Sequence, residues 1–166
     1  KNIITLGDCE DIIDSEVIQC ETEKDLLIQW KNLIRKVDPD FLIGYNIWGF
    51  DLEYLYNRSF ENKCNNKFLS LGRMKNIKSV MKQENNNRGQ DVYNLKKLPI
   101  NGRVTVDVYN YLRNNYNLES FKLNNVSEYF LDDSKKDITP EEIFRLQKGN
   151  SFDRCKIAEY CLQDCI

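Results

Sequence analysis

The sequence predicts an α/β domain in which helices flank a mixed central sheet. Between residues 26 and 37, apolar side chains recur at helical spacing and give the segment one apolar face. Residues 41–44 follow without a charged or polar side chain, which is typical of a strand buried on both faces. Residues 51–62 then predict a second helix. A helix, a strand and a helix in close succession favour this fold class.

The first of these helices has a predicted start and a predicted end. Thr22 stands three residues before Asp25 in a capping-box-like arrangement, which predicts the start. Residues 38–40, Asp-Pro-Asp, predict the end, because proline disfavours the helical conformation in the residue before it. Upstream of this helix, residues 3–6 predict a short strand.

The middle of the chain predicts a loop and then a hairpin. Residues 62–90 are polar and interrupted, and we expect an exposed, mobile loop there. Asn101 and Gly102 lie between two extended stretches, and Asn-Gly in that setting is a strong hairpin signal. A helix is predicted next, over residues 108–115.

Three further helices are predicted to complete the chain, and the first covers residues 120–131. Its Leu123, Val126 and Phe130 are expected to face inward. The second is predicted between residues 139 and 149, where Thr139-Pro140-Glu141-Glu142 supplies a cap, a proline at the first helical position and a capping-box glutamate, and Gly149 ends the helix. Ser151 is predicted to cap the last helix, which runs to the end of the chain.

The composition limits the classes of function. The chain has 166 residues, 41% of them apolar, which fits one globular domain with a proper core. The net charge of −2 excludes a non-specific polycation, so a contact with nucleic acid requires a local basic patch. The sequence carries no signal peptide and no long apolar run, which predicts a reducing, non-membrane compartment. It has no initiator Met and no helix-ending signal at YCLQDCI, so we expect a piece of a longer protein.

The six cysteines do not predict a zinc site. None of them forms a CxxC pair, and the chain has no histidine, so the usual zinc-ligand spacing is missing. Cys161 and Cys165 stand one helical turn apart and are predicted to be small buried hydrophobes.

Two segments carry candidate chemistry. In GYNIWGFDLEYL, Asp51 stands at the start of a predicted helix, where a lone carboxylate could simply be a cap. In YCLQD, Tyr160 and Asp164 stand four residues apart and so project from the same helix face. Carboxylates that converge from two helices suit hard divalent cations, and two such ions about 4 Å apart can stabilise a phosphodiester displacement. The alternative is that Tyr160 and Asp164 are an ordinary half-exposed surface pair.

These segments resemble the exonuclease motifs of family B DNA polymerases. NIWGFDLEYL resembles the second motif, and YCLQD resembles the third. The longer segments DPDFLIGYNIWGFDLEYL, GRVTVDVYNYLRNNYNLESFKLNNVSEYFL and YCLQDC come in the order and rough spacing of polymerase delta and its relatives in large viruses. The resemblance covers nearly the whole chain and implies a ribonuclease-H-like 3′–5′ exonuclease domain, residues 1–166, whose N-terminal strand or strands are missing.

The resemblance also implies roles for individual residues. Asp51 and Asp164 correspond to metal ligands, and Tyr160 corresponds to the tyrosine that positions the attacking water. Asn46 and Phe50 correspond to residues that bind the single-stranded substrate end. The implied cofactors are two Mg²⁺ ions, for which Mn²⁺ can substitute. The implied partners are the primer 3′ end, the remaining polymerase domains, accessory subunits and a sliding clamp, and no membrane. The implied location is the nucleus, or the site of viral replication in a host cell.

One family motif is missing from this sequence. The first motif is an Asp-x-Glu on a strand, and residues 8–10, Asp-Cys-Glu, have these letters but lie after the predicted strand, so we expect a solvated turn there. We expect the true first motif to precede Lys1, and residues 1–166 alone to be inactive. The palm, fingers and thumb of a polymerase are also absent from this sequence.

Alternatives stay open at four positions and for the function itself. Asp107 is either a residue near the site or, as we favour, a helix N-cap. Trp48 either stacks on an unpaired base or packs where the strand turns into the helix. Lys96 and Lys97 either contact DNA or protect a strand edge. The alternative functions are a stand-alone DNA or RNA exonuclease of the same fold and a non-catalytic scaffold.

Overall fold

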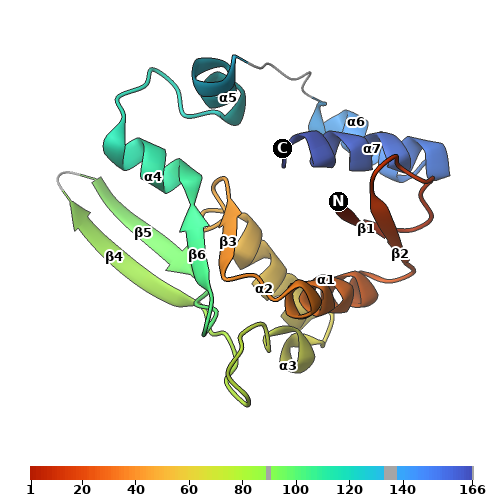
Figure 1. The fold of residues 1–166 in the computed structure, drawn as a ribbon, viewed down its shortest axis with the longest axis horizontal. Helices are drawn as coiled ribbons and strands as arrows, with labels where there is room; N and C mark the ends of the chain where they lie inside the picture. The colour runs from red at the N-terminus through yellow and green to blue at the C-terminus, as the bar shows by residue number, and fades with distance from the viewer. Residues whose placement is uncertain (89–90, 133–137, 166) are drawn as a thin grey trace. The chain divides into compact units, whose positions relative to one another are not determined.

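The computed structural model describes residues 1–88, 91–132 and 138–165, and it describes no side chain between residues 84 and 95. The architecture is mixed α/β (Figure 1). The strands are β1 (Asn2–Leu6), β2 (Glu16–Cys20), β3 (Phe41–Gly44), β4 (Lys82–Arg88), β5 (Asp91–Lys97) and β6 (Val104–Asp107). The helices are α1 (Glu23–Val37), α2 (Asp51–Glu61), α3 (Asn65–Phe68), α4 (Val108–Asn115), α5 (Leu123–Leu131), α6 (Pro140–Gln147) and α7 (Ser151–Gln163).

The chain forms two compact units, which we describe separately. The terminal unit comprises Lys1–Gln29 and Ser120–Ile166, and the central unit comprises Trp30–Glu119. Within the described ranges, no helix is both long and apolar enough to cross a bilayer.

The strands pair in three small sheets. β1 pairs with β2 in parallel, β3 pairs with β6 in parallel, and β4 pairs with β5 antiparallel. The mixture of parallel and antiparallel pairs agrees with the predicted fold class. Within the described residues, however, each strand has a single partner, so the expected central sheet is not formed.

The terminal unit packs α7 against β1 around a small core. Its buried residues are Cys9, Ile12, Cys155 and Ala158, with Ile3, Val17 and Leu162 packed against them. Burial raises the pKa of the Cys9 thiol to about 11, and the neighbouring Cys155 adds to the rise. This thiol is therefore protonated at neutral pH and packs as an apolar group.

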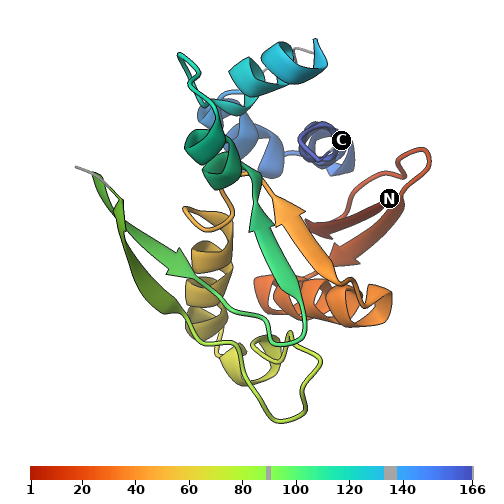
Figure 2. The same cartoon turned by 60° about the vertical axis from the view of Figure 1, so that its left-hand side comes forward.

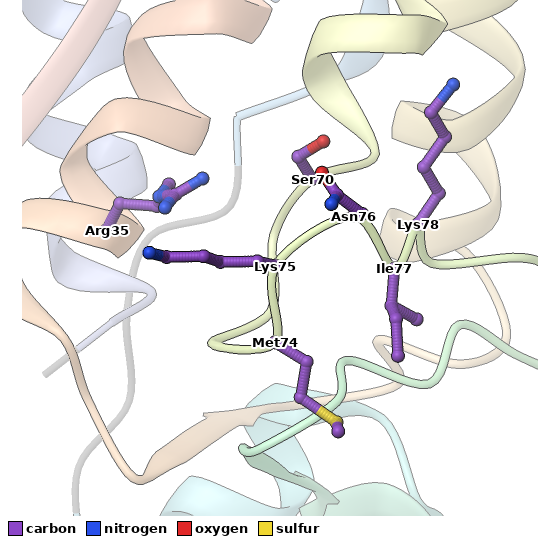
Figure 3. A pocket seen from close by; sticks show the side chains of 7 residues that line it. All are labelled: Arg35, Ser70, Met74, Lys75, Asn76, Ile77 and Lys78. Carbon is purple, nitrogen blue, oxygen red and sulfur yellow. The ribbon is translucent and has the colours of Figure 1, made fainter.

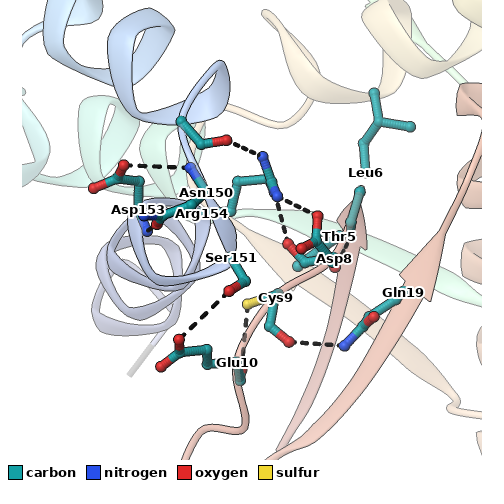
Figure 4. A network of polar contacts seen from close by, with 12 residues as sticks. Thr5, Leu6, Asp8, Cys9, Glu10, Gln19, Asn150, Ser151, Asp153 and Arg154 are labelled. Carbon is teal, nitrogen blue, oxygen red and sulfur yellow. Dashed lines mark hydrogen bonds and ion pairs between the residues drawn. The ribbon is translucent and has the colours of Figure 1, made fainter.

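Polar contacts tie the segment after β1 to α7 (Figure 4). Arg154 forms an ion pair with Asp8, and its Nε donates to the Asp8 carbonyl at 2.6 Å. The Ser151 hydroxyl donates to the Glu10 carboxylate at 3.4 Å. The Gln19 amide donates to the Cys9 carbonyl at 2.7 Å. The carboxylates of residues 8 and 10 are exposed and lie beyond β1, as predicted, whereas Cys9 between them is buried, so the segment is only partly solvated.

The central unit has its own core, built between α2 and the segments before β4 and after β5. Leu52, Leu71, Leu98 and Ile100 are buried in it. Trp30, Leu42, Ile47, Trp48, Tyr56 and Met81 pack around them. Figure 2 shows β3 and β6 side by side and pointing the same way.

Two arginines fasten the start of β3 within this unit. Arg103 is buried, with 2% of its side chain exposed, and pairs with Asp38 at 2.8 Å. Arg73 pairs with both Asp38, at 2.9 Å, and Asp40, at 2.5 Å. Hydrogen bonds from these two guanidinium groups lower the pKa of the Asp38 carboxyl. The same residues that end α1 therefore also anchor the strand that follows.

Several predicted elements are confirmed. Helix α1 begins as expected, since the Asp25 backbone N–H donates to Thr22 Oγ1 at 3.1 Å. Strand β1, helix α2 and helix α4 also lie where the sequence predicts them. Helix α6 has its predicted cap, because the Glu142 N–H donates to Thr139 Oγ1 at 3.3 Å, and the Gly149 N–H donates back to the Leu146 carbonyl.

The predicted strand at residues 41–44 exists, but its burial on both faces is wrong. Phe41 and Ile43 are 59% and 66% exposed, whereas Leu42 packs against the central core. The reason is that β3 pairs only with β6 among the described strands, and the core covers one of its faces.

The expected loop over residues 62–90 is partly wrong. The segment contains α3 and β4, and the side chains of Phe68 and Leu71 are fully buried. Phe68 stacks on Trp30 with 5.8 Å between ring centroids. The apolar residues of the 62–90 segment are too few and too scattered for periodicity to reveal them, yet they pack in the core of the central unit. Residues 89 and 90 lie outside the described residues.

The hairpin predicted at Asn101-Gly102 is also wrong. The turn is present, with Gly102 at φ +86° and the Arg103 N–H donating to the Ile100 carbonyl. It does not join paired strands, because β5 pairs with β4 and β6 pairs with β3. Gly72 explains the tight approach here, since a Cβ on it would lie 2.6 Å from the Asn101 carbonyl oxygen.

Three predictions in the last third of the chain need correction. Helix α5 starts at Leu123 rather than at residue 120. Phe130 does not face inward, since it is 40% exposed, and Val126 is the buried residue of this helix. The cap of α7 is Asn150 rather than Ser151, because the Asn150 side chain accepts from the Asp153 N–H and completes a capping box.

The predicted burial of Cys161 and Cys165 is wrong as well, since both are exposed. The buried stripe of α7 follows Cys155, Ala158 and Leu162 at helical spacing. Cys161 precedes Leu162 by one residue, a rotation of about 100° around the helix, and so leaves this stripe.

We expect Leu71→Ala to lower the free energy of unfolding by about 2–5 kcal/mol, because it empties a fully buried site in the central core. Urea unfolding of the purified protein measures this. Met74→Ala is the matched control in the same loop, since Met74 is 56% exposed. Equal effects of the two substitutions would show that the 69–74 segment is not part of the core.

Candidate active site

The candidate site is built on the loop that joins β3 to α2, residues 45–50. Asn46 lies in the left-handed region at φ +58°, and its carbonyl accepts from the Gly49 and Phe50 N–H groups, both at 3.1 Å. Two glycines allow close approach of neighbouring side chains. A Cβ on Gly44 would lie 2.4 Å from the Ile47 side chain, and one on Gly49 would lie 2.3 Å from the Asn46 side chain. The 45–50 loop is therefore one compact turn.

This turn delivers Asp51 to the first residue of α2. Asp51 and Glu53 make the first turn of the helix acidic, which suits the partial positive charge at a helix N-terminus. The Asp51 side chain is exposed. Partial burial by neighbouring residues nevertheless raises the pKa of the Asp51 carboxyl. The Asp51 backbone N–H opposes the rise, and the negative charge of Asp107 adds to it.

Asp107 holds the 45–50 loop in place. It ends β6 directly opposite Gly44, because β3 and β6 pair in parallel. Its side chain is only 2% exposed. One carboxylate oxygen accepts from the Asn46 N–H at 2.8 Å, and the other accepts from the Trp48 N–H at 3.1 Å.

The same carboxylate also begins α4. It accepts from the Tyr109 N–H at 3.1 Å and from the Asn110 side-chain amide at 2.9 Å. Rings of Tyr45 and Tyr109 contact edge to face at 5.6 Å, a second link between the 45–50 loop and α4. The helix-cap alternative for Asp107 is thus confirmed. The sequence did not reveal that one buried carboxylate both caps α4 and fastens the loop that carries Asp51. No local sequence pattern marks these contacts, because they span 61 and 59 residues.

The structure also bears on the alternatives at Trp48, Lys96 and Lys97. Trp48 is half-buried against the central core, and the Lys97 ammonium lies 4.4 Å from its ring centroid. This supports the packed alternative. The buried Trp48 indole N–H has no hydrogen-bond partner in the part of the chain that the structure describes. Lys96 pairs with Glu53 and so links β5 to α2.

Two aromatic rings stand beside Asp51. Phe50 and Tyr54 are stacked with 5.8 Å between centroids and 6° between ring planes. They are 63% and 51% exposed. Large apolar rings left in water on the first turn of a helix are available to stack on a planar ligand.

Tyr160 and Asp164 lie in the last turn of α7. The Asp164 N–H donates to the Tyr160 carbonyl at 3.2 Å, and Asp164 is the C-cap and exposed, whereas Tyr160 is half-buried. They belong to the terminal unit, and Asp51 belongs to the central unit. The predicted approach of Asp51 and Asp164 therefore stays a prediction.

The donor chemistry at Asp51 fits a hard divalent cation. An exposed carboxylate oxygen is the kind of ligand that Mg²⁺ takes, and a bound cation would favour the ionised form that the surroundings disfavour. Among the described residues, no group of three or more His, Cys, Asp or Glu side chains could hold a metal ion. A metal ion at Asp51 would need further oxygen ligands.

We expect Asp107→Ala to speed amide hydrogen exchange at Asn46 and Trp48, because both partly buried N–H groups lose their acceptor. Each unsatisfied group costs about 1–3 kcal/mol, so the urea midpoint should fall as well. Asp107→Asn keeps one acceptor oxygen and should have a smaller effect.

The matched control is Thr139→Ala, which removes the cap of α6. It should cost about 1 kcal/mol without changing exchange at Asn46 and Trp48. Unchanged exchange at both amides in Asp107→Ala would contradict the role of Asp107 in the 45–50 loop.

Comparison with known proteins identifies the family. The family model described as "DNA polymerase family B, exonuclease domain" matches residues 1–126. The DNA polymerase delta catalytic subunits of Glycine max and Drosophila melanogaster are 39% and 40% identical, each over 99% of this chain and 15% of the relative. A DNA polymerase of Pyramimonas orientalis virus is 34% identical over 99% of this chain and 18% of the relative.

The chain thus spans less than a fifth of the length of these relatives. The matched region includes the 45–50 loop, Asp51 and Asp107, which are the residues that build the candidate site in the central unit. The chain belongs to the exonuclease domain family of the family B DNA polymerases.

Proposed function

We propose that this chain is the proofreading 3′–5′ exonuclease domain of a replicative DNA polymerase. It would hydrolyse the 3′-terminal phosphodiester of a primer. The observation that carries the proposal is the 45–50 loop, which Asp107 fastens so that Asn46, Phe50 and Asp51 lie together after β3. The family match includes this loop. A ribonuclease-H-like fold is part of the proposal, and the parallel β3–β6 pair followed by α2 and α4 supports it.

The proposed metal ligands are Asp51 and Asp164. They would hold two Mg²⁺ ions together with further carboxylates, and Mn²⁺ would substitute for Mg²⁺. The ions would stabilise charge on the attacking and leaving oxygens of the phosphodiester. Asp51 contributes an exposed carboxylate on a rigid helix start, and Tyr160 would hold and orient the attacking water through its hydroxyl.

The proposed substrate contacts lie next to Asp51. The exposed Phe50–Tyr54 stack would hold the unpaired bases of a frayed primer end, a kind of contact worth about 1–3 kcal/mol per base. Asn46 would hydrogen-bond to the strand end, and the compact 45–50 loop fixes its position. Stacking on aromatic rings tolerates any base, which suits an enzyme that must remove whichever nucleotide was misincorporated.

The remaining partners follow from the same proposal. The domain would work with the other domains of a polymerase chain, with accessory subunits and with a sliding clamp. It would act in a nucleus or at a site of viral replication. A stand-alone exonuclease of this fold is the second candidate among enzymes. The relatives named above are all polymerases, which favours the first. A non-catalytic scaffold is disfavoured by the exposed carboxylate that Asp107 helps to place.

In the full-length polymerase, we expect Asp51→Ala to reduce exonuclease activity on a mismatched primer by at least about 10³-fold. A metal ligand supports transition-state stabilisation of several kcal/mol, and 4 kcal/mol corresponds to about this factor. Primer extension should survive. The measurement is single-turnover cleavage in Mg²⁺, followed by extension of a matched primer.

Glu53→Gln is the matched control, a second carboxylate on the first turn of α2 that pairs with Lys96. It should keep exonuclease activity within a few-fold of the wild-type enzyme. Cleavage by Asp51→Ala at a rate near that of wild type would refute the assignment of Asp51.

A further inference from the structure

A second feature of the central unit is a segregation of positive charge. The whole chain has 24 basic and 26 acidic residues. Residues 62–83 carry no carboxylate at all. The basic residues of this segment are Lys63, Lys67, Arg73, Lys75, Lys78 and Lys82. A cluster of one sign in a chain that is otherwise balanced indicates a local electrostatic surface rather than general solubility.

Part of this segment forms a hollow with the C-terminal half of α1 (Figure 3). Its volume is about 500 Å³, and its lining residues are Arg35, Ser70, Met74, Lys75, Asn76, Ile77 and Lys78. The Arg35 and Lys75 side chains extend toward one another from opposite sides of it. Two cations that converge on one space repel each other unless an anion lies between them.

Among the described residues, no carboxylate is paired with the two cations that converge on the hollow. Arg73, in the same loop, is paired with two carboxylates. In contrast, no ion pair joins Arg35 or Lys75 to a carboxylate in the ranges that the structure describes. The pKa of neighbouring Lys31 is lowered, first by burial and then by the charges of Arg35 and Lys67. The hollow therefore has a positive potential.

Polar contacts hold the loop that lines the hollow. The Ser79 N–H donates to the Leu69 carbonyl at 2.8 Å and closes the loop at its base, and Ser79 is 2% exposed. Lys78 donates to the Asn66 side chain at 2.7 Å. The pairing of Arg73 with Asp38 fastens the same loop to the start of β3. Since little ordering would be required, an anion could bind without the cost of closing a flexible loop.

The hollow is not part of the candidate active site. It adjoins the loop that Arg73 fastens to the start of β3, whereas Asp51 follows the end of that strand. We propose that this hollow, with Arg35 and Lys75 as its charged contacts, binds backbone phosphates of a nucleic-acid strand at a distance from the scissile bond. Ser70 and Asn76 supply polar groups of the kind that accompany Lys and Arg at phosphates. The choice of nucleic acid rests on the polymerase family and not on hydrolysis at Asp51.

The test uses the full-length polymerase and a primer–template with a long single-stranded region, in EDTA so that the strand is not cut. Binding is measured between 50 and 200 mM salt for Arg35→Ala/Lys75→Ala. Each lost phosphate contact lowers the slope of log K against log salt by about 0.7–0.9. The double variant should therefore lose about 1.4–1.8 from the slope. The control is Lys24→Ala/Lys148→Ala, which removes two exposed charges in the terminal unit and should change the slope by much less.

A second variant guards against an effect on folding. Lys75→Glu places a carboxylate beside Arg35, so the urea midpoint of this variant should not fall. It should nevertheless lower the slope of log K against log salt at least as much as the double variant does. A slope equal to that of the control in both variants would overturn the proposal. The proposal would also be overturned if the variants bound polyglutamate more weakly but bound DNA as tightly as the wild-type enzyme. That result would indicate an acidic protein partner. Failure of the function proposed for Asp51 gives a different result. The Asp51→Ala enzyme would then still cleave the primer, while the salt slope of DNA binding would still depend on Arg35 and Lys75.

Discussion

One buried carboxylate organises the part of this domain that carries its candidate chemistry. Asp107 accepts four hydrogen bonds, two from the 45–50 loop and two from the start of α4. It is almost completely inaccessible to water, so each of these bonds replaces hydration that the carboxylate has lost. The parallel pairing of β3 with β6 puts Asp107 opposite Gly44, where it can reach both segments. The position of Asp51 at the start of α2 follows from this constraint, because the 45–50 loop has little freedom left.

The sequence predicted local structure better than long-range pairing. Thr22 and Thr139 each mark a helix start through a hydrogen bond within three residues, and both caps are present. The Asn101-Gly102 turn was also predicted correctly as a turn, but not as a hairpin, because strand partners are chosen by the whole unit. Phe68 and Leu71 were missed because their burial depends on Trp30 and Leu98, which are distant in sequence and leave no periodic signal.

The sequence predicted the position of Asp51 and only part of the construction around it. Asp51 was identified from its motif, and the structure places it at a helix start as expected. The role of Asp107 was only half recognised, since capping is a local property and its contacts with Asn46 and Trp48 span 61 and 59 residues. Cys161 illustrates the opposite error, because a residue type that is usually buried stands on an exposed face of α7. Residue type indicates how often a side chain is buried, whereas tertiary packing decides whether a particular side chain is buried.

We propose that Asp51 and Asp164 share one metal site. Its most direct test is an experimental structure of the full-length polymerase soaked in Mn²⁺, with anomalous scattering to locate the metal. We expect manganese bound between the two residues, with their carboxyl groups within about 10 Å of each other, a separation that one metal pair and its ligands can bridge. Carboxyl groups farther apart than this, with manganese bound at only one of them or elsewhere, would contradict the claim.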